Sequence, residues 1–582
     1  MDTSPCRPLR VPVGQEAERW RTFRSERTLV VAARTVTSTV RMLETLPALV
    51  RGDGRISTVF AYDATSAFST GVLDLLKDAG CRTIPWPRMT DADPALLISA
   101  SENIDVPRGD WPVLVLPHGV GFQKMVPDSR TAGTRLSGVV PDSLLESGRV
   151  LLAVSHPAQE EQLIAARPKA AGRTAVVGDP VLDELSTSTD RAADYRIGLG
   201  VTPGRRLVVL SSTWGPTSLL GRHPGLPAQL LASLPYDEYQ VAAIIHPNVW
   251  AGHGAWQIRT LLADALDAGL LLIPPVHIWR PALVAADLVI GDHGSVTLYG
   301  AALGKPVLLG AFGSDAVPGT AIARLGSTAP HLEPGGDVRH QIESVLATHA
   351  PDRFSDVVAG AFAHRGEASG LLRTVLYDLL RLSEPDRSPP PVLSLPAPDQ
   401  PSVRVTSWLV AATVTEDDDG VVITTDRRPA VVHAEDDIRN TGDDFQEEPP
   451  GRYVHQAATD DERDIRVREN SSVLLRSRPA PTTTSAAAWI ESALRRYPGS
   501  LLASTAMTGG GHCVGVRDGR VVEVAFTDPD LDTGLAAALV YACLRANLPL
   551  DTTLTLRTGP GRLADAVLRL LPGRGPHRTS SV

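Results

Sequence analysis

The chain has 582 residues, of which 43% are hydrophobic and 21% are charged, and its formal net charge is −10. This composition is typical of a globular protein and excludes fibrous and fully disordered chains. A length of 582 residues exceeds what a single hydrophobic core supports, so we expect two to four domains.

No run of the sequence approaches eighteen apolar residues, and the N-terminal residues lack the apolar core of a signal peptide, so we expect a cytoplasmic protein. The four cysteines are widely separated and form no metal-binding motif, so neither disulfides nor structural zinc are expected. Arginine outnumbers lysine 52 to 4, which we attribute to a GC-rich bacterial genome and not to nucleic-acid binding.

The chain begins with a predicted lead-in, residues 1–27. Within it, residues 16–27 (EAERWRTFRSER) are predicted to be helical and are rich in arginine, with Trp20 and Phe23 three residues apart. Such a helix could lie on an anionic lipid surface, which makes a peripheral contact with the inner face of the membrane one expectation. The alternative is a helix packed on the first domain.

Apolar strands then alternate with helical runs in two consecutive blocks, the pattern of parallel α/β sheets. The predicted strands of the first block are 28–33, 56–62, 82–84, 96–100, 113–119, 150–155 and 174–178. Those of the second block are 207–212, 241–247, 270–274, 288–290 and 307–310, with helical residues at 354–383 to finish it. We therefore predict an α/β protein with two Rossmann-like domains, 28–190 and 191–383, that face a cleft.

Three further segments are predicted after the two blocks: a Pro-rich linker at 384–403, short strands with an acidic low-complexity stretch at 404–478, and a small α+β domain at 479–582. Between Glu416 and Asp464 there are 16 acidic and 5 basic residues, so the negative charge of the chain belongs to this one segment, which we expect to be a solvated loop or a disordered insert. A hairpin is predicted at 513–526, with a type I′ turn at Asp518 and Gly519. We see no motif for chemistry in this tail.

Polar residues mark the ends of several predicted strands, where parallel sheets bind their ligands. His118 and Gly119 end one strand, and histidine is the side chain most easily poised as a base near neutral pH. Asp179 follows another strand and is placed to cap a helix. Thr213 and His246 end two strands of the second block. Taken singly, each of these features is as readily an ordinary turn or cap.

The turn Gly291–Ser295 is the most informative of these strand ends, because it links a short apolar strand to a helix through small and polar residues. Free N–H groups at a helix N-terminus, together with the helix dipole, favour a bound anion. The turn is therefore predicted to hold a phosphate.

The order of these motifs resembles that of the CDP-glycerol glycerophosphotransferase family, whose members make teichoic-acid-type polymers and have the two-domain GT-B fold. The resemblance covers roughly residues 110 to 315. The matching segments are VLPHGVGFQK at 115–124, GDPVLDEL at 178–185, SSTWGP at 211–216, IIHPN at 244–248 and AADLVIGDHGSV at 285–296. They are similar to the family's Trp-His-Gly-Thr with its following lysine, Gly-x-Pro-Arg-x-Asp, Ala-Pro-Thr-Trp-Arg, His-Pro and Ala-Asp-x-x-Ile-Thr-Asp-Tyr-Ser-Ser-Val.

Carried over residue by residue, the resemblance implies that His118 is the general base on an acceptor hydroxyl. It implies that the donor's nucleotide and phosphates are held by His246, Thr213, Asp292, Gly294, Ser295 and Val296. Gly119, Lys124, Asp179 and His293 are implied as secondary site residues. The donor would be nucleotide-linked and the acceptor a polymer or a lipid-linked molecule, with no metal or other cofactor and no nucleic acid.

The chain departs from the family at positions that concern the donor. Pro117 stands where the family has tryptophan, and Gly215 where it has arginine. Tyr299 stands where the family has an acidic residue in the region that binds the ribose, so the donor is expected to differ from CDP-glycerol or to bind less well. Two alternatives to a transferase stay open. One is a non-catalytic protein that keeps the scaffold for binding or regulation, and the other is a sugar-nucleotide epimerase, against which Tyr299 counts because that reaction needs acid/base carboxylates in the cleft.

Overall fold

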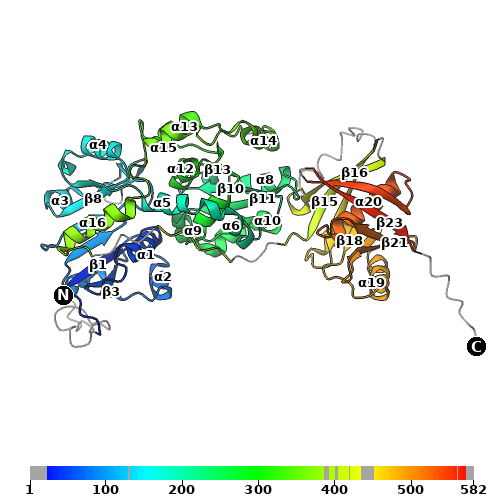
Figure 1. Ribbon diagram of the computed structural model, residues 1–582, viewed down its shortest axis with the longest axis horizontal. Helices are drawn as coiled ribbons and strands as arrows, with labels where there is room; N and C mark the ends of the chain where they lie inside the picture. Colours follow the sequence, from blue (N-terminus) through cyan, green and yellow to red (C-terminus); the bar gives the residue numbers. More distant parts are fainter. Residues whose placement is uncertain are drawn as a thin grey trace, which may run out of the picture.

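The computed structural model describes residues 22–128, 132–333, 335–385, 392–399, 404–417, 420–433, 451–559 and 561–571. Residues 16–21 of the predicted N-terminal helix, and residues 418–419 and 434–450 of the acidic stretch, lie outside these residues, and the described residues 22–27 form no helix. Three units follow one another along the molecule, two of them α/β units and the third a barrel (Figure 1).

The first unit is built on a seven-stranded parallel sheet of order β3-β2-β1-β4-β5-β8-β9. Its strands are β1 (Arg27–Ala33), β2 (Ile56–Tyr62), β3 (Thr83–Pro85), β4 (Leu96–Ser99), β5 (Val113–Val115), β8 (Val150–Val154) and β9 (Thr174–Val176). Its helices are α1 (Val36–Leu49), α2 (Val72–Asp78), η2 (Trp86–Ala92), α3 (Asp142–Glu146), α4 (Pro157–Ala166) and η3 (Pro168–Ala170). A short hairpin, β6 (Met125–Pro127) and β7 (Thr134–Leu136), stands beside the sheet.

Strand β1 is apolar without interruption because both faces of the sheet are covered. Leu29 and Val31 pack with α1 and α2, whereas Val30 and Ala32 pack with η2, α3 and α4 on the opposite face. The predicted parallel sheet of this block is therefore confirmed.

The second unit is built on a five-stranded parallel sheet of order β12-β11-β10-β13-β14. Its strands are β10 (Arg206–Ser212), β11 (Tyr239–Ile245), β12 (Leu271–Ile273), β13 (Leu288–Gly291) and β14 (Val307–Leu309). Helices α5 (Pro180–Thr187), α6 (Ala192–Gly198), α11 (Trp279–Ala285), α12 (Ser295–Ala302), α13 (Ala321–Thr328) and α15 (Ser355–Ala359), with η4 (Thr189–Arg191), lie on one side of it. Helices α7 (Leu219–Arg222), α8 (Leu226–Ser233), α9 (Pro247–Leu261), α10 (Ala263–Asp267) and α14 (Val338–Thr348) lie on the other.

Helix α16 (Ala368–Leu380) returns from the second unit to the first (Figure 1). Its residues Leu372, Leu376 and Leu380 share one core with α1 and β1, and the Tyr377 hydroxyl donates to Asp53 at 2.9 Å. The sequence places this helix at the end of the second block, but its apolar stripe is buried against the first sheet. The chain therefore crosses between the two α/β units twice.

The third unit is a closed barrel of nine strands, in the order β15-β16-β22-β23-β21-β20-β19-β18-β17. The strands are β15 (Ser407–Asp417), β16 (Gly420–Pro429), β17 (Arg452–Thr459), β18 (Val473–Leu475), β19 (Leu502–Ala506), β20 (His512–Val516), β21 (Val521–Phe526), β22 (Thr552–Thr558) and β23 (Arg562–Leu570). Its helices are η5 (Ala430–His433), α18 (Ile465–Asn470), α19 (Thr483–Arg496) and α20 (Thr533–Arg545).

Helix α20 and the inward residues of all nine strands form one hydrophobic core. The helix is apolar all round, as a fully buried helix must be, and every residue from Gly534 to Cys543 is buried. Helix α19 covers the outside of the barrel, where Ile490 packs with Cys513. The prediction is corrected here: strands of 404–478 and of 479–582 close a single barrel, and β17 lies within the stretch expected to be a solvated loop or a disordered insert.

The predicted hairpin is present as β20 and β21, but its turn is not type I′. That turn type needs a positive φ at both central residues, and among the residues at 518 and 519 only Gly519 has one, at 94°. The N–H of Gly519 donates to the carbonyl of Val516 at 3.0 Å. A type I turn followed by a left-handed glycine, the three-residue hairpin loop, fits this pattern.

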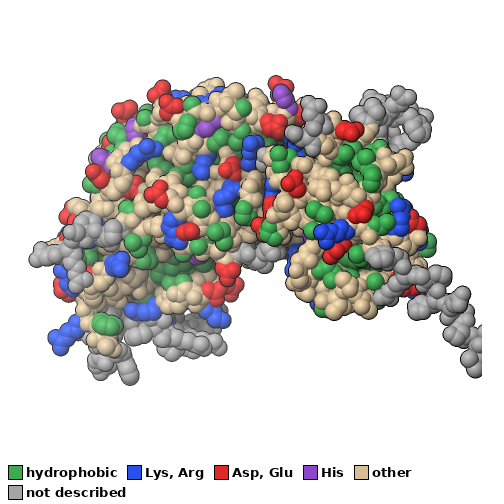
Figure 2. All heavy atoms as spheres, turned by 45° about the vertical axis from the view of Figure 1, so that its right-hand side comes forward, with side chains coloured by type: hydrophobic (Ala, Val, Ile, Leu, Met, Phe, Trp, Pro, Cys, Tyr) green, Lys and Arg blue, Asp and Glu red, His purple; other side chains and the backbone are tan. Residues whose placement is uncertain are grey.

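None of the helices in the described part of the chain combines the length and the apolarity needed to cross a bilayer. Lys and Arg side chains are interspersed with Asp and Glu on the face of the molecule seen in Figure 2. Arg427 fixes the barrel to the second α/β unit, because its guanidinium pairs with Asp237 at 2.6 Å and with Asp532 at 2.8 Å.

Candidate functional site

A cavity of about 470 Å³ opens between the two α/β units, at the carboxyl ends of both parallel sheets. Loops after β1, β2, β4 and β5 line it from the first unit, and loops after β10, β11, β12 and β13 from the second. This is the position where open parallel sheets bind ligands. Nine of the eleven predicted site residues line the cavity: His118, Gly119, Lys124, Thr213, His246, His293, Gly294, Ser295 and Val296. Asp179 and Asp292 do not.

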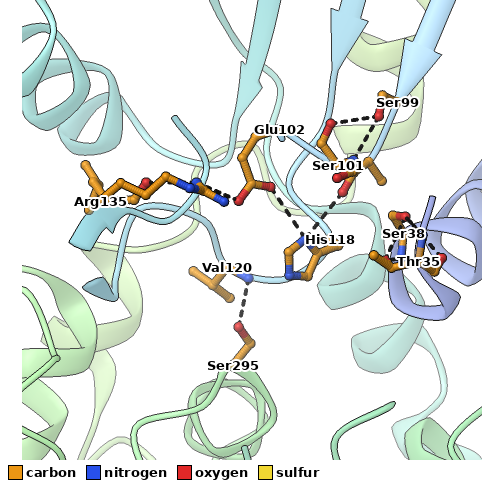
Figure 3. Close-up of polar contacts among 11 residues, drawn as sticks. Thr35, Ser38, Ser99, Ser101, Glu102, His118, Val120, Arg135 and Ser295 are labelled. Carbon is orange, nitrogen blue, oxygen red and sulfur yellow. Dashed lines mark hydrogen bonds and ion pairs between the residues drawn. The ribbon is translucent and has the colours of Figure 1, made fainter. Parts of the chain in front are cut away.

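His118 lies after β5, and its ring is oriented by two acceptors. Its Nδ1 is 3.3 Å from the carbonyl oxygen of Ala100 and 4.0 Å from Oε2 of Glu102 (Figure 3). Because both neighbours can only accept, we assign the proton of the neutral ring to Nδ1. The lone pair of Nε2 is then available to take a proton from a ligand in the cavity, as a general base must.

Glu102 is the residue behind His118, and the motif reasoning from the sequence missed it. It is buried after β4, and its Oε1 accepts from Nη1 of Arg135 on β7 at 3.1 Å (Figure 3). Burial alone would raise the pKa of this carboxyl, but His118, Arg135 and backbone N–H groups outweigh it, and the pKa is lowered. The carboxylate is therefore charged beside the imidazole. Its position just past a predicted strand was the signal that could have found it.

His246 faces the same cavity with the opposite ring orientation. It caps α9, and its Nδ1 accepts from the backbone N–H of Asn248 at 3.1 Å, so the proton of the neutral ring lies on Nε2. Burial, with contributions from the charges of His118 and Lys124, lowers the pKa of His246 to about 3. The ring is neutral at physiological pH, and its Nε2–H is a donor for an acceptor oxygen.

The predicted phosphate loop is present as the turn from β13 into α12. Gly294 is its N-cap with no side-chain cap, so N–H groups of the first turn are left for another partner. The hydroxyl of Ser295 accepts from the backbone N–H of Val120 at 3.1 Å, which joins this loop to the His118 loop (Figure 3). A Cβ at Gly119 would lie 2.6 Å from Oγ of Ser295, so only glycine permits this approach.

Asp292 has a structural position in this loop and not the ligand contact that the resemblance implies. It is fully buried, and its carboxylate accepts three backbone N–H groups, from Thr213 and Leu219 at 2.8 Å and from Gly294 at 2.9 Å. Burial raises its pKa, against the effects of His293 and of these hydrogen bonds. Asp292 thus ties the loop after β10 to the loop after β13.

Lys124 and His293 both pair with the carboxylate of Asp315. Oδ2 of Asp315 lies 3.2 Å from Nζ of Lys124 and 3.1 Å from Nε2 of His293. His293 also accepts from the N–H of Gly313 at Nδ1, so its Nε2 donates to Asp315. Burial lowers the pKa of His293 in spite of the neighbouring carboxylates. The pair therefore holds the first unit against the second, and the Nε2–H of His293 is already engaged by Asp315.

Neither family models nor curated protein sequences match this chain. Solved structures do. The wall teichoic acid polymerase TagF is similar at 12% identity, over 62% of this chain and 90% of that chain, with a TM-score of 0.43. The UDP-GlcNAc 2-epimerase from Neisseria meningitidis is similar at 13% identity, over 61% and 100%, with a TM-score of 0.40. A glycosyltransferase from Rickettsia africae ESF-5 is similar at 12% identity, over 62% of this chain and 100% of that chain, with a TM-score of 0.35.

Asp179 and Tyr299 lie together at the boundary between the two units. Asp179 caps α5, as predicted, and its carboxylate also pairs with Arg41 at 3.0 Å. The hydroxyl of Tyr299 donates to the same carboxylate at 2.6 Å. Burial and Asp179 raise the pKa of Tyr299 well above its usual value. Tyr299 lines the cavity as a neutral phenol whose proton is already engaged, so it supplies no carboxylate to a ligand.

Among the described residues, no group of three or more His, Cys, Asp or Glu side chains is placed to hold a metal ion. The residues that line the cavity suit a ligand with phosphates and hydroxyl groups. They offer a histidine lone pair, a histidine N–H, helix N-termini and aromatic faces, including Trp214 and Trp279.

Proposed function

We propose that this protein is a transferase that moves a glycerophosphate or glycosyl group from a nucleotide-linked donor to a hydroxyl of a polymer or lipid-linked acceptor. The observation that carries the proposal is the pair of histidines in one cavity. His118 presents a lone pair and His246 presents an N–H, and each ring is fixed in its tautomer by a contact at Nδ1. One ring suits an acceptor hydroxyl, and the other suits a donor phosphate.

In the proposed reaction, Nε2 of His118 takes the proton of the acceptor hydroxyl while its oxygen attacks the phosphorus of the donor, or the anomeric carbon if the donor is a nucleotide sugar. The bond to the nucleotide phosphate breaks, and that phosphate leaves with the bonding electrons. Glu102 stabilises the imidazolium that forms, because its carboxylate is charged and buried beside the ring. The Nε2–H of His246 and the N-terminus of α12 are placed to stabilise the leaving phosphate.

The first experiment measures donor binding and turnover separately. Saturation-transfer NMR with CDP-glycerol and UDP-sugars should detect binding, and His118→Ala should retain binding while turnover falls by about 100-fold or more, the usual contribution of a general base. His253→Ala removes an exposed histidine of α9 outside the cavity and should leave both unchanged. Absence of binding by every nucleotide at millimolar concentration would contradict the transferase and favour a non-nucleotide binding protein.

The same assay separates the role of Glu102 from that of a structural residue. Glu102→Gln removes the charge beside His118 but keeps the shape, so kcat should fall with KM nearly unchanged. Glu102→Asp restores the charge and should recover part of the rate. Equal losses for Gln and Asp would show that only packing depends on Glu102.

A further inference from the structure

One face of helix α1 lines the cavity with polar side chains that the proposed reaction does not use. Thr37, Arg41 and Glu44 are spaced by four and three residues, so they lie on the same face of the helix. Their end of the cavity is marked by Tyr299 and Trp279, whose ring centroids are 6.1 Å apart. The second carboxylate that lines the cavity, Glu102, belongs to the His118 end.

Glu44 is held in one orientation and keeps one oxygen open. Its Oε1 lies 2.6 Å from Nη2 of Arg280 on α11 and 3.2 Å from Nδ1 of His277. Its side chain lines the cavity and is only 8% exposed, and its Oε2 has no partner among the described residues. A rigid, charged oxygen of this kind is a strong acceptor for hydroxyl groups.

Arg41 stands one turn before Glu44 and has donors without partners. It is 5% exposed and pairs with Asp179 through Nη2 at 3.0 Å, while its Nε and Nη1 have no partner in the described part of the chain. The hydroxyl of Thr37 is also without a partner. These atoms are almost fully covered by their neighbours, so a ligand oxygen would meet them after a small movement of this wall, and it would then recover the free energy that an unpaired buried donor costs.

The charges at this end of the cavity exclude a phosphate. Arg41 is neutralised by Asp179, and Glu44 by Arg280, so no net positive charge remains for an anion. The open oxygen of Glu44 would repel one. An uncharged group with adjacent hydroxyls fits, because each hydroxyl can donate to the carboxylate while its oxygen accepts from an N–H.

We propose that Glu44 and Arg41 form a subsite for an uncharged vicinal diol, with Trp279 as the aromatic face beside it. The inference rests on the proposed function and adds which chemical group of the ligand, the diol, these residues would recognise. Two sources could supply the diol, the ribose of the nucleotide and the polyol or sugar that is transferred or accepted. Tyr299 does not compete for this task, since its hydroxyl donates to Asp179.

The test uses the full chain and compares ligands that differ only in the diol. Calorimetry should show that CDP or UDP binds about tenfold or more tightly than its 2′,3′-dideoxy counterpart if the ribose is the source, since hydrogen bonds to a charged group are among the stronger ones. Glu44→Gln should remove this preference. In the second arm, glycerol and N-acetylglucosamine are the probes, and their saturation-transfer signals should weaken in Glu44→Gln if a polyol is the source.

Glu184→Gln is the matched control, because Glu184 also pairs with Arg280 but does not line the cavity. It should leave both arms unchanged. If Glu44→Gln does not fold, Glu44→Asp keeps the charge, shortens its reach and should weaken the same signals. Nucleotide binding without any diol preference, together with polyol signals that Glu44→Gln does not change, would overturn the subsite alone. Failure of all nucleotide binding would overturn the proposed function, and the polyol arm would still decide the subsite.

Discussion

At the scale of single residues, His118 and His246 show how one side-chain type acquires two chemistries. Carbonyl and carboxylate oxygens surround Nδ1 of His118 and leave it protonated there, whereas a backbone N–H meets Nδ1 of His246 and leaves the proton on Nε2. The contact at one ring nitrogen thus decides what the other can do. The carbonyl of Ala100 and the carboxylate of Glu102 follow β4, and the N–H of Asn248 belongs to the first turn of α9.

His246→Asn separates the capping role of this residue from its ligand contact. Asparagine is a strong N-cap and can still accept from the N–H of Asn248, but its NH2 group is on a shorter side chain and does not extend as far as the Nε2–H that His246 presents to the cavity. We expect the melting temperature to change little and the affinity for a nucleotide donor to fall about tenfold, the loss of one hydrogen bond to a phosphate. His246→Gln is the converse variant, because glutamine caps α9 less well but keeps an N–H donor on a longer side chain. An unchanged affinity in His246→Asn would remove His246 from the donor site.

At the scale of elements, the loops after β10 and β13 act as one unit because a single carboxylate joins them. Three backbone N–H groups converge on Asp292, which lies below the cavity and not in it. This arrangement sets the position of Thr213 on one loop and of Gly294 on the other. The shape of the candidate phosphate loop therefore depends on a residue that touches no ligand.

Asp292→Asn should be strongly destabilising although it preserves shape. Either orientation of the amide places its NH2 group against at least one backbone N–H, so a buried donor loses its partner and meets another donor. We expect the free energy of unfolding to fall by about 3 kcal/mol, measured by denaturant melts. Asp264→Asn, on the exposed side of α10, is the control and should change stability by less than about 0.5 kcal/mol. Equal stability of the two variants would contradict the structural role of Asp292.

At the scale of the whole molecule, charged and polar contacts set the three units against one another. Lys124 and Asp315 link the α/β units on one side of the cavity, Arg41, Asp179 and Tyr299 on the other, and Arg427 joins the barrel to the second sheet. Each of these pairs is buried or half-buried, so removing one partner would leave a charge without compensation. The cavity is thus framed by contacts between units.

The barrel carries a pH-dependent element of its own. His455 on β17 is buried against Tyr541 of α20, with ring centroids 4.2 Å apart, and neither ring nitrogen has a partner among the residues that the structure describes. Burial lowers its pKa to about 3 from an ordinary 6.5. Between these values the unfolded chain binds a proton that the native barrel does not. The free energy of unfolding is therefore highest, as far as His455 is concerned, above pH 6.5. It falls by about 1.4 kcal/mol for each pH unit below that value, because protonation of His455 favours the unfolded chain.

His455→Phe keeps an aromatic ring beside Tyr541 and removes this titration. Melting temperatures measured by calorimetry from pH 7.5 to pH 4.5 should fall less steeply in His455→Phe than in the unaltered protein. His340→Phe, which removes an exposed histidine of α14, is the matched control and should keep the original pH dependence. Parallel curves for the unaltered protein and His455→Phe would show that His455 is not the group responsible.

Much of the fold and part of the candidate site follow from the sequence. The apolar runs of the two α/β blocks predict their twelve sheet strands, because a parallel strand covered on both faces is apolar without interruption. Since the carboxyl ends of such strands meet at one edge, His118, Thr213 and His246 could be placed near one another from their positions after these runs. The barrel strands β18 and β19 stand outside this regular alternation of strands and helices, and the sequence did not predict them.

What only the tertiary structure decided is which partner each polar group meets. Asp292 and Glu102 both follow predicted strands, yet one accepts three backbone N–H groups and the other faces a histidine in the cavity. Barrel closure depends on the pairing of β16 with β22, which are more than 120 residues apart, and no local periodicity encodes that contact. Periodicity reports which face of an element is buried. The identity of the neighbour, and with it the charge and protonation of a side chain, depends on packing between segments that are distant in the chain.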